Sequence, residues 1–238
     1  MRIAVFGDIH SNKHALEAVL ADIDQKAPEK VFCLGDLVGY GAYPNEVIEI
    51  IRNRSIPTIM GNYDDGVGFD RDECGCAYKD LEARRLGGLS LAWTKARVTA
   101  DNKAFLRSLA PNIRLQVGNR RVLLVHGSPR RINEYVYEDR PQWSLEHIAQ
   151  SSQADVLIFG HTHLPYVKQV GSVLFINPGS AGKPKDGDPR AAYALVDAGQ
   201  EVGVELRRVA YDVAAAAAAV RSSGLPLHFA DLLERASG

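Results

Sequence analysis

The first sixty residues alternate between short apolar runs and segments with helical periodicity. The apolar runs at 2–6, 30–34 and 56–60 predict three buried strands. Apolar residues at helical spacing predict one helix from residue 13 to about residue 27, and a second is predicted at 45–52. Strands that alternate with helices favour right-handed β-α-β units, so this pattern predicts a largely parallel sheet.

A glycine and then a polar residue follow each of the three predicted strands. The segments are Gly7-Asp8-Ile9-His10, Gly35-Asp36 and Gly61-Asn62. Ligands bind at the carboxyl ends of the strands in sheets of this kind. We therefore expect these polar side chains to converge at one edge of the sheet.

The same pattern returns in the second half of the chain. A predicted strand at 121–125 is followed by His126, and one at 156–159 is followed by Gly160-His161-Thr162-His163. Positions i and i+2 of an extended segment point the same way, so the last two histidines could face one point. The other predicted elements are strands at 113–117, 166–169, 173–176, 192–196 and 202–209, and helices at 142–150, 213–221 and 226–235.

Residues 70–111 interrupt this pattern with a helix-rich stretch. Leucines between Leu81 and Leu91 favour one helix, and Asp101 could cap another that continues to Leu109. We interpret the stretch as a helical insertion within a single domain that spans residues 1–238. Two roles stay open for it, a packing subdomain or a lid that shapes access to a site.

The composition narrows the class of protein. The 238 residues are 46% apolar and 24% charged, with a formal net charge of −1, as expected for a globular protein with no overall attraction to nucleic acid. No apolar run is long enough to cross a membrane, and no secretory signal is recognisable at the N-terminus, so a cytoplasmic protein is expected. We expect Cys33 to be a small core residue, and we interpret Cys74 and Cys76 as structural rather than as a metal or redox site.

The polar residues that follow the strands form a recognisable donor set. Two carboxylates, four imidazoles and one amide exceed what one divalent ion needs, and they suit two ions such as manganese, iron, zinc, cobalt or nickel. Pairs of such ions, about 3.5–4 Å apart and bridged by a carboxylate, serve in the hydrolysis of phosphate esters. Asp36 is the natural bridge. The predicted ligands are Asp8, His10, Asp36, Asn62, His126, His161 and His163. His14 lies outside this set and is expected at the surface or behind a ligand.

These motifs, in this order and with these glycines, resemble the calcineurin-like metallophosphoesterase superfamily over residues 3 to about 182. The segment 177–182, Asn-Pro-Gly-Ser-Ala-Gly, is most similar to the small bacterial phosphodiesterase-type branch. The resemblance implies an α/β fold with mixed sheets, a four-layer α-β-β-α sandwich, rather than one parallel sheet. It also implies that Asp36 is shared between two ions. Asp8, His10 and His163 would complete the first site, and Asn62, His126 and His161 the second.

The resemblance also implies a reaction, the hydrolysis of phosphodiester or phosphomonoester bonds by a hydroxide that bridges the ions, with manganese as the expected activating metal. The family usually has histidine after Gly-Asn, whereas this chain has Tyr63. A phenol is a poorer acid than imidazole at neutral pH, so we expect diesters or aryl esters to be preferred. Asn62 and His126 are candidates for stabilising the transition state. Arg130 and Lys183 are candidate substrate contacts, with Arg131 and Lys185 nearby.

Other functions stay open at this point. A Ser/Thr protein phosphatase or a dinucleotide hydrolase would use the same ligands. A non-catalytic binding scaffold would be expected to lack some of them, and a nuclease would favour a basic groove that the net charge does not indicate. The sequence does not identify the natural substrate, the native metal or the number of subunits, but it indicates a small phosphate ester rather than a membrane or nucleic-acid partner.

Overall fold

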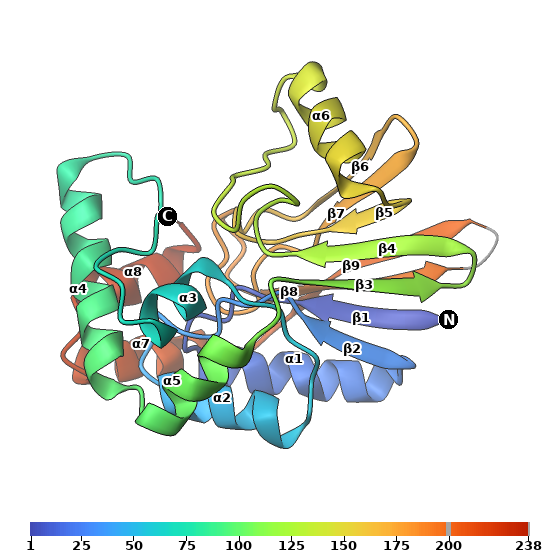
Figure 1. Cartoon of the computed structure of the whole chain (residues 1–238). Helices are drawn as coiled ribbons and strands as arrows, with labels where there is room; N and C mark the ends of the chain where they lie inside the picture. The colour runs from blue at the N-terminus through green and yellow to red at the C-terminus, as the bar shows by residue number, and fades with distance from the viewer. Residues whose placement is uncertain (199–200, 238) are drawn as a thin grey trace.

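The computed structural model describes residues 1–198 and 201–237, and it forms a sandwich of two β-sheets with helices on both outer faces (Figure 1). Helices α1 (Lys13–Lys26) and α2 (Pro44–Asn53) lie on the first sheet, and α6 (Gln142–Ser152) lies on the second. The fold is therefore the α/β sandwich with mixed sheets that the family resemblance implies.

The first sheet has four strands in the order β2-β1-β8-β9. The first two strands pair in parallel, as expected, but β8 pairs antiparallel with β1 and with β9. These strands are β1 (Arg2–Phe6), β2 (Lys30–Cys33), β8 (Ala191–Ala198) and β9 (Val202–Val209).

The second sheet has five strands in the order β3-β4-β5-β7-β6. Its centre, β4-β5-β7, is parallel, and a hairpin partner flanks it on each side. The expectation of one largely parallel sheet is therefore wrong, because the chain forms two sheets and antiparallel pairings complete both of them. The strands are β3 (Asn112–Val117), β4 (Arg120–Val125), β5 (Val156–Ile158), β6 (Tyr166–Val170) and β7 (Val173–Asn177).

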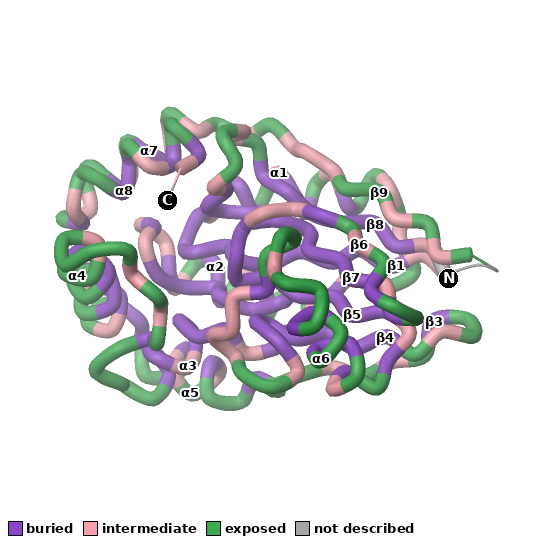
Figure 2. The backbone as a smooth tube through the Cα atoms, turned by 90° about the horizontal axis from the view of Figure 1, so that it is seen from above, coloured by how far each residue is buried: buried purple, intermediate pink, exposed green. Residues whose placement is uncertain are grey.

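Three apolar clusters correspond to the three interfaces of the sandwich. Alternate residues of β1 divide between two of them, since Ile3 and Val5 face the second sheet while Ala4 and Phe6 face the helices. The third cluster joins the outer face of the second sheet to Leu145 and other residues of α6. Figure 2 shows the buried residues running through the middle of the molecule, with the exposed ones along the outer helices.

The remaining helices gather beyond the carboxyl ends of the strands (Figure 1). One more apolar cluster joins Leu86 to the two C-terminal helices, so the predicted insertion packs against the end of the chain. Thr99, rather than Asp101, caps the second helix of that insertion by accepting a hydrogen bond from the amide of Asn102. These helices are α3 (Asn62–Gly68), α4 (Leu81–Arg97), α5 (Ala100–Ser108), α7 (Val213–Ser222) and α8 (His228–Arg235).

One predicted strand does not form. Residues 56–60 make only isolated bridges, from Thr58 to Cys33 and from Ile59 to Ala110. The segment thus crosses the sheet edge without joining a ladder, and the chain then turns directly into α3, a helix that the apolar pattern did not predict. Within the described part of the chain, no helix is both long and apolar enough to span a bilayer.

Candidate metal centre

The loops after β1, β2, β4 and β5 meet at one edge of the sandwich. The amide of Asp8 donates to the carbonyl of Gly35, and the amide of Gly160 donates to the carbonyl of His126, so the loops are tied to one another in pairs. All seven predicted ligands are buried there: Asp8, His10, Asp36, Asn62, His126, His161 and His163.

Six of the seven side chains form two adjacent groups. One consists of Asp8, His10 and His163, and the other of Asp36, His126 and His161. Within each group the potential ligand atoms lie within 4.8 Å of one another. The Oδ1 atom of Asn62 lies 3.0 Å from Nε2 of His126, which places the amide beside the second group.

Asp36 lies between the two groups. Its Oδ2 atom is 3.6 Å from Nε2 of His10 in one group and 3.5 Å from Nε2 of His126 in the other. Its Oδ1 atom accepts a 2.8 Å hydrogen bond from the amide of Tyr63, which fixes the carboxylate. The carboxylate of the second group therefore also reaches a histidine of the first group.

Backbone carbonyls orient three of the four imidazoles. The Nδ1 atoms of His10, His126 and His163 lie 3.1, 2.8 and 2.6 Å from the carbonyl oxygens of Val38, Leu34 and Lys183. An Nδ1–H that donates to a carbonyl leaves Nε2 as the lone-pair atom, the usual arrangement behind a metal-bound histidine. Nε2 of His10 and Nε2 of His163 accordingly face each other at 3.2 Å.

Several buried polar atoms of the site have no hydrogen-bond partner among the described residues. They are Oδ1 of Asp8 and both ring nitrogens of His161. Buried polar atoms are nearly always satisfied in proteins, so this concentration at one place calls for a ligand. A cation would satisfy these oxygen and nitrogen donors, and the residues present therefore fit two divalent ions.

Burial determines the ionisation of the site. It lowers the pKa of His10 and His161 to about 3 and that of His163 well below its usual value, so these rings are neutral near pH 7, as metal ligands must be. It also raises the pKa of Asp8 to about 7.

The central pair behaves differently. Burial opposes charge on both partners, but the proximity of His126 holds the pKa of Asp36 below its usual range, and Asp36 in turn raises the pKa of His126 to about 10. Asp36 thus favours the protonated form of His126, so a proton and a cation would compete for this ring.

The ligand loops hold strained backbone. Asp8, His10, Asp36, His161 and His163 all have φ between 49° and 67°, the left-handed region that side chains with a Cβ seldom adopt. Such strain concentrates at functional sites. The motif glycines fit the same picture, since a Cβ at position 61 would collide with the Asp36 carboxylate and one at position 160 with that of Asp8.

Three supporting residues were not predicted. Asp64 accepts hydrogen bonds from the amides of Gly61 and Leu37, at 3.0 and 2.9 Å, and so ties together two of the ligand loops. The rings of Tyr40 and Tyr135 pack on His10 and His161, with centroids 5.0 and 4.1 Å apart. Only Asp64 had a signal in the sequence, as an acid next to the Gly-Asn motif.

Tyr63 is 1% exposed and packs edge-on against His10, with ring centroids 5.5 Å apart. Its hydroxyl has no hydrogen-bond partner among the described residues. Burial and the neighbouring phenol of Tyr40 raise the pKa of Tyr63 well above its usual value, so the phenol stays protonated.

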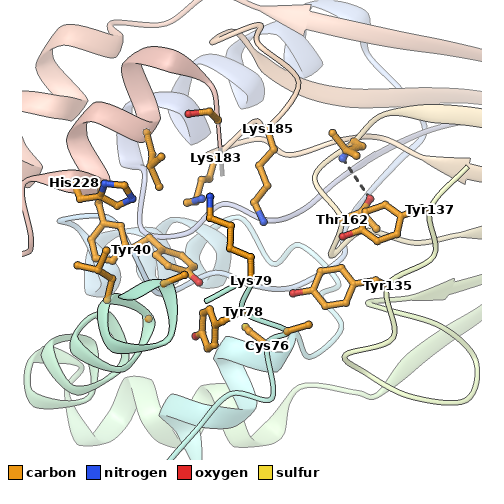
Figure 3. Close-up of a pocket in the computed structure, with 18 residues that line it drawn as sticks. Tyr40, Cys76, Tyr78, Lys79, Tyr135, Tyr137, Thr162, Lys183, Lys185 and His228 are labelled. Atoms are coloured by element: carbon orange, nitrogen blue, oxygen red, sulfur yellow. Dashed lines mark hydrogen bonds between the residues drawn. The ribbon is translucent and has the colours of Figure 1, made fainter. Parts of the chain in front are cut away.

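A cavity of about 460 Å³ adjoins the centre (Figure 3). Thr162, which lies between His161 and His163, lines it together with Lys183, one of the two predicted substrate contacts. Burial lowers the pKa of Lys183 well below its usual value and also lowers that of Lys185. Arg130, the other predicted contact, lies outside the lining and forms an ion pair with Glu134.

The remaining candidates lie as follows. Cys33 is buried in the core, which confirms that prediction. Cys74 and Cys76 lie close to the centre, with their Sγ atoms 3.0 Å apart, and the Asn62 amide donates to the Cys74 carbonyl and to the Cys76 sulfur. His14 is half-buried on α1, against Tyr43.

Comparisons with known proteins agree with this geometry. Residues 1–201 match the model of the calcineurin-like phosphoesterase superfamily domain. An uncharacterised protein of Methanocaldococcus jannaschii, MJ0912, is 34% identical over 94% of this chain and 93% of its own length. The phosphodiesterase YfcE of Escherichia coli is 27% identical over 83% of this chain and 88% of its own length.

Solved structures show the same fold. A metallophosphoesterase from Sphaerobacter thermophilus superposes with a TM-score of 0.78 and 30% identity, covering 99% of both chains. The hypothetical protein PH1004 from Pyrococcus horikoshii gives a TM-score of 0.85 at 24% identity, covering 98% of this chain and 97% of its own.

Proposed function

The chain belongs to the calcineurin-like phosphoesterase superfamily and is a metal-dependent phosphoesterase, and from that premise we propose that it is a dinuclear phosphodiesterase acting on small phosphate esters. The observation that carries the proposal is the position of Asp36, with one carboxylate oxygen within 3.6 Å of a histidine of each ligand group. The similarity to the Escherichia coli phosphodiesterase YfcE supports the assignment of phosphodiesters as substrates.

The proposed ligand sets follow from the two groups. Asp8, His10 and His163 would hold the first ion and Asn62, His126 and His161 the second, with Asp36 common to both. Such ions, when bound, polarise the phosphoryl oxygens and lower the pKa of a water between them. We propose manganese as the activating metal, because the mixed oxygen and nitrogen donor set suits it.

The protein's own groups position the substrate and stabilise charge. The backbone carbonyls that receive Nδ1–H hold the imidazoles in place before substrate arrives, so little reorganisation is needed during the reaction. We propose that Asn62 and His126 stabilise the negative charge that develops on the phosphoryl group. Lys183, on the wall of the cavity, is the proposed contact to the substrate.

Tyr63 supports a preference for diesters and aryl esters. Its phenol is buried and its pKa is raised, so it is a poor proton donor for an alkoxide leaving group. Aryl leaving groups need no such proton. A phosphodiester also brings less negative charge to the site than a monoester.

The test is turnover of bis(4-nitrophenyl) phosphate and of 4-nitrophenyl phosphate by protein purified without chelators and supplied with Mn²⁺. We expect the diester to be hydrolysed about tenfold or more faster, as judged by kcat/KM. A clear preference for the monoester would refute the diester assignment. The absence of any hydrolysis, in protein shown to contain two metal ions per chain, would favour the non-catalytic scaffold.

A further inference from the structure

The cavity lies directly beside the metal centre. Tyr40 packs on His10 and Tyr135 packs on His161, and both tyrosines also line the cavity. The lining therefore begins at the ligands of both sites. A phosphate ester bound at the centre would extend its remaining part into this space.

Three lysine side chains gather in the cavity. Lys79, Lys183 and Lys185 all line it, and Figure 3 shows their side chains directed into it from two opposite segments of the chain. None of the three ammonium groups has a carboxylate partner or a hydrogen bond among the described residues, and Lys183 is only 5% exposed. Its nearest aromatic contact is the ring of Tyr40, 4.9 Å from Nζ.

This lack of partners contrasts with the cations nearby. Asp186 directly follows Lys185 in the chain, yet its carboxylate pairs with Arg208 instead. Lys103, in the same helical insertion as Lys79, pairs with Asp70. Acids are thus available locally, and the three lysines of the cavity remain without them. Several lysine side chains that line one cavity without acid partners are typical of an anion-binding site.

Charge balance between the two metal ions and the scissile phosphate does not require the three lysines. Two divalent ions bring four positive charges, and Asp8 and Asp36 neutralise two of them. The two that remain suffice for a singly charged diester and for the water that attacks it. The lysines therefore provide for a second anionic group in the substrate.

The walls favour a planar ring in the same substrate. Tyr40, Tyr78, Tyr135 and Tyr137 line the cavity together with Phe229 of α8. Figure 3 shows Tyr40, Tyr78 and Tyr135 around one side of the space and Tyr137 at its edge. Aromatic side chains of this kind stack on nucleobases with little dependence on base identity.

We propose that the cavity is a nucleotide subsite. The substrate is a nucleotide phosphodiester that carries a second phosphoryl group, which binds Lys79, Lys183 and Lys185 while the base packs on the tyrosines. This inference rests on the proposed function, since it supplies the substrate class of the same site. A volume of about 460 Å³ is within the range of ligand pockets and suits a nucleotide.

A matched pair of chromogenic substrates tests the proposal. Thymidine 5′-(4-nitrophenyl phosphate) and its 3′-phosphorylated form have the same scissile bond and leaving group, and they differ only in the second phosphate. We expect the 3′-phosphorylated ester to have at least a tenfold higher kcat/KM. Lys79→Ala and Lys185→Ala should each reduce that ratio at least fivefold, because each removes a charge-assisted contact.

Lys103→Ala is the matched control, since it removes a lysine of the same insertion that has an acid partner, and it should leave the ratio unchanged. A wild-type ratio near one would overturn the proposal. So would a ratio that neither lysine variant changes.

A binding measurement separates this inference from the proposed function. Calorimetry with the metal-loaded enzyme should show at least tenfold tighter binding of thymidine 3′,5′-bisphosphate than of thymidine 5′-monophosphate, and Lys185→Ala should remove most of that difference. Hydrolysis of bis(4-nitrophenyl) phosphate without this difference in affinity would refute the subsite alone. The affinity difference without hydrolysis of any ester would refute the phosphodiesterase and retain the subsite.

Discussion

At the amino ends of β4 and β5, Arg121 and Asp155 form an ordinary exposed ion pair, with Nη2 2.8 Å from Oδ1. At the carboxyl ends the same two strands lead to His126 and His161, which are buried. Both ring nitrogens of His161 are without a partner among the described residues, and its backbone is left-handed. The polar side chains at one end of the sheet are thus paired at the surface, while those at the other end are buried and leave polar atoms unsatisfied.

The difference between the two ends of these strands indicates where the protein has lower stability in exchange for function. Left-handed backbone at a residue with a Cβ, and a buried polar atom with no partner, both raise the free energy of the folded state. Where such features concentrate at one place, they mark a site at which stability has been given up for function. We therefore expect substitutions at the carboxyl ends to change activity and metal content, and those at the amino ends to change stability alone.

The largest effect is expected for Asp36→Asn. An amide cannot bridge two cations as a carboxylate does, so turnover of bis(4-nitrophenyl) phosphate should fall about 10³-fold. Elemental analysis should show the loss of at least one ion per chain. Asp24→Asn is the control, an exposed acid on α1 that pairs with Arg54. Retention of both ions and of near-normal turnover in Asp36→Asn would show that the aspartate is not the bridge.

A somewhat smaller effect is expected for Gly61→Ala. The added methyl group would collide with the Asp36 carboxylate and move it from its place between the two ligand groups. Turnover should fall about 10²-fold, in line with the loss of one stabilising group in a preorganised site. The matched control is Gly88→Ala in α4, where a Cβ would meet no atom within 4 Å. That control should unfold at a slightly higher temperature, since alanine favours helix by about 0.5–1 kcal/mol over glycine.

Tyr63→His should change substrate preference rather than abolish activity. An imidazole can protonate an alkoxide near neutral pH, so kcat/KM for an alkyl phosphomonoester should rise about tenfold relative to that for bis(4-nitrophenyl) phosphate. The measurement is the ratio of the two rates with Mn²⁺ present. An unchanged ratio would mean that the side chain at position 63 does not act on the leaving group.

The smallest effect is expected at the amino ends of the strands, from Asp155→Asn. Hydrogen bonds from Arg121 lower the pKa of Asp155 to about 2, below its unfolded value near 4. A lowered carboxyl pKa stabilises the fold above about pH 4, and this contribution is lost as the pH falls towards 2. Because the pair is largely exposed, the variant should be less stable by at most about 1 kcal/mol at pH 7.

Denaturant unfolding of the wild type and Asp155→Asn at pH 7, 4 and 2.5 measures this difference, which should shrink towards the lowest pH. Turnover at pH 7 should be the same in both proteins. If Asp155→Asn lost activity while its stability was unchanged, the proposed difference between the two ends of the sheet would be wrong.

Much of the fold could be predicted because its signals are local. The apolar runs of β1 and β2 and the periodicity of α1 each reside in a few adjacent residues. The segment 56–60 has the composition of a strand, but its neighbours allow only isolated bridges. Helix α3 has little apolar periodicity and begins where Asp64 accepts the amide hydrogen of Gly61, a contact that the pattern alone does not reveal. The direction of β8 beside β1 was equally invisible, since it depends on pairing across almost the whole chain.

The sequence by itself indicated the seven candidate ligands, because most of them follow a recognisable strand and the topology brings strand ends together. It did not reveal the cavity wall, to which Tyr40, Lys79, Tyr135, Lys185 and Phe229 come from separate segments. Their spacing in the sequence does not indicate that they lie around one cavity. Only tertiary packing brings them together, because helix α4 and the C-terminal helices close over the strand ends through long-range apolar contacts.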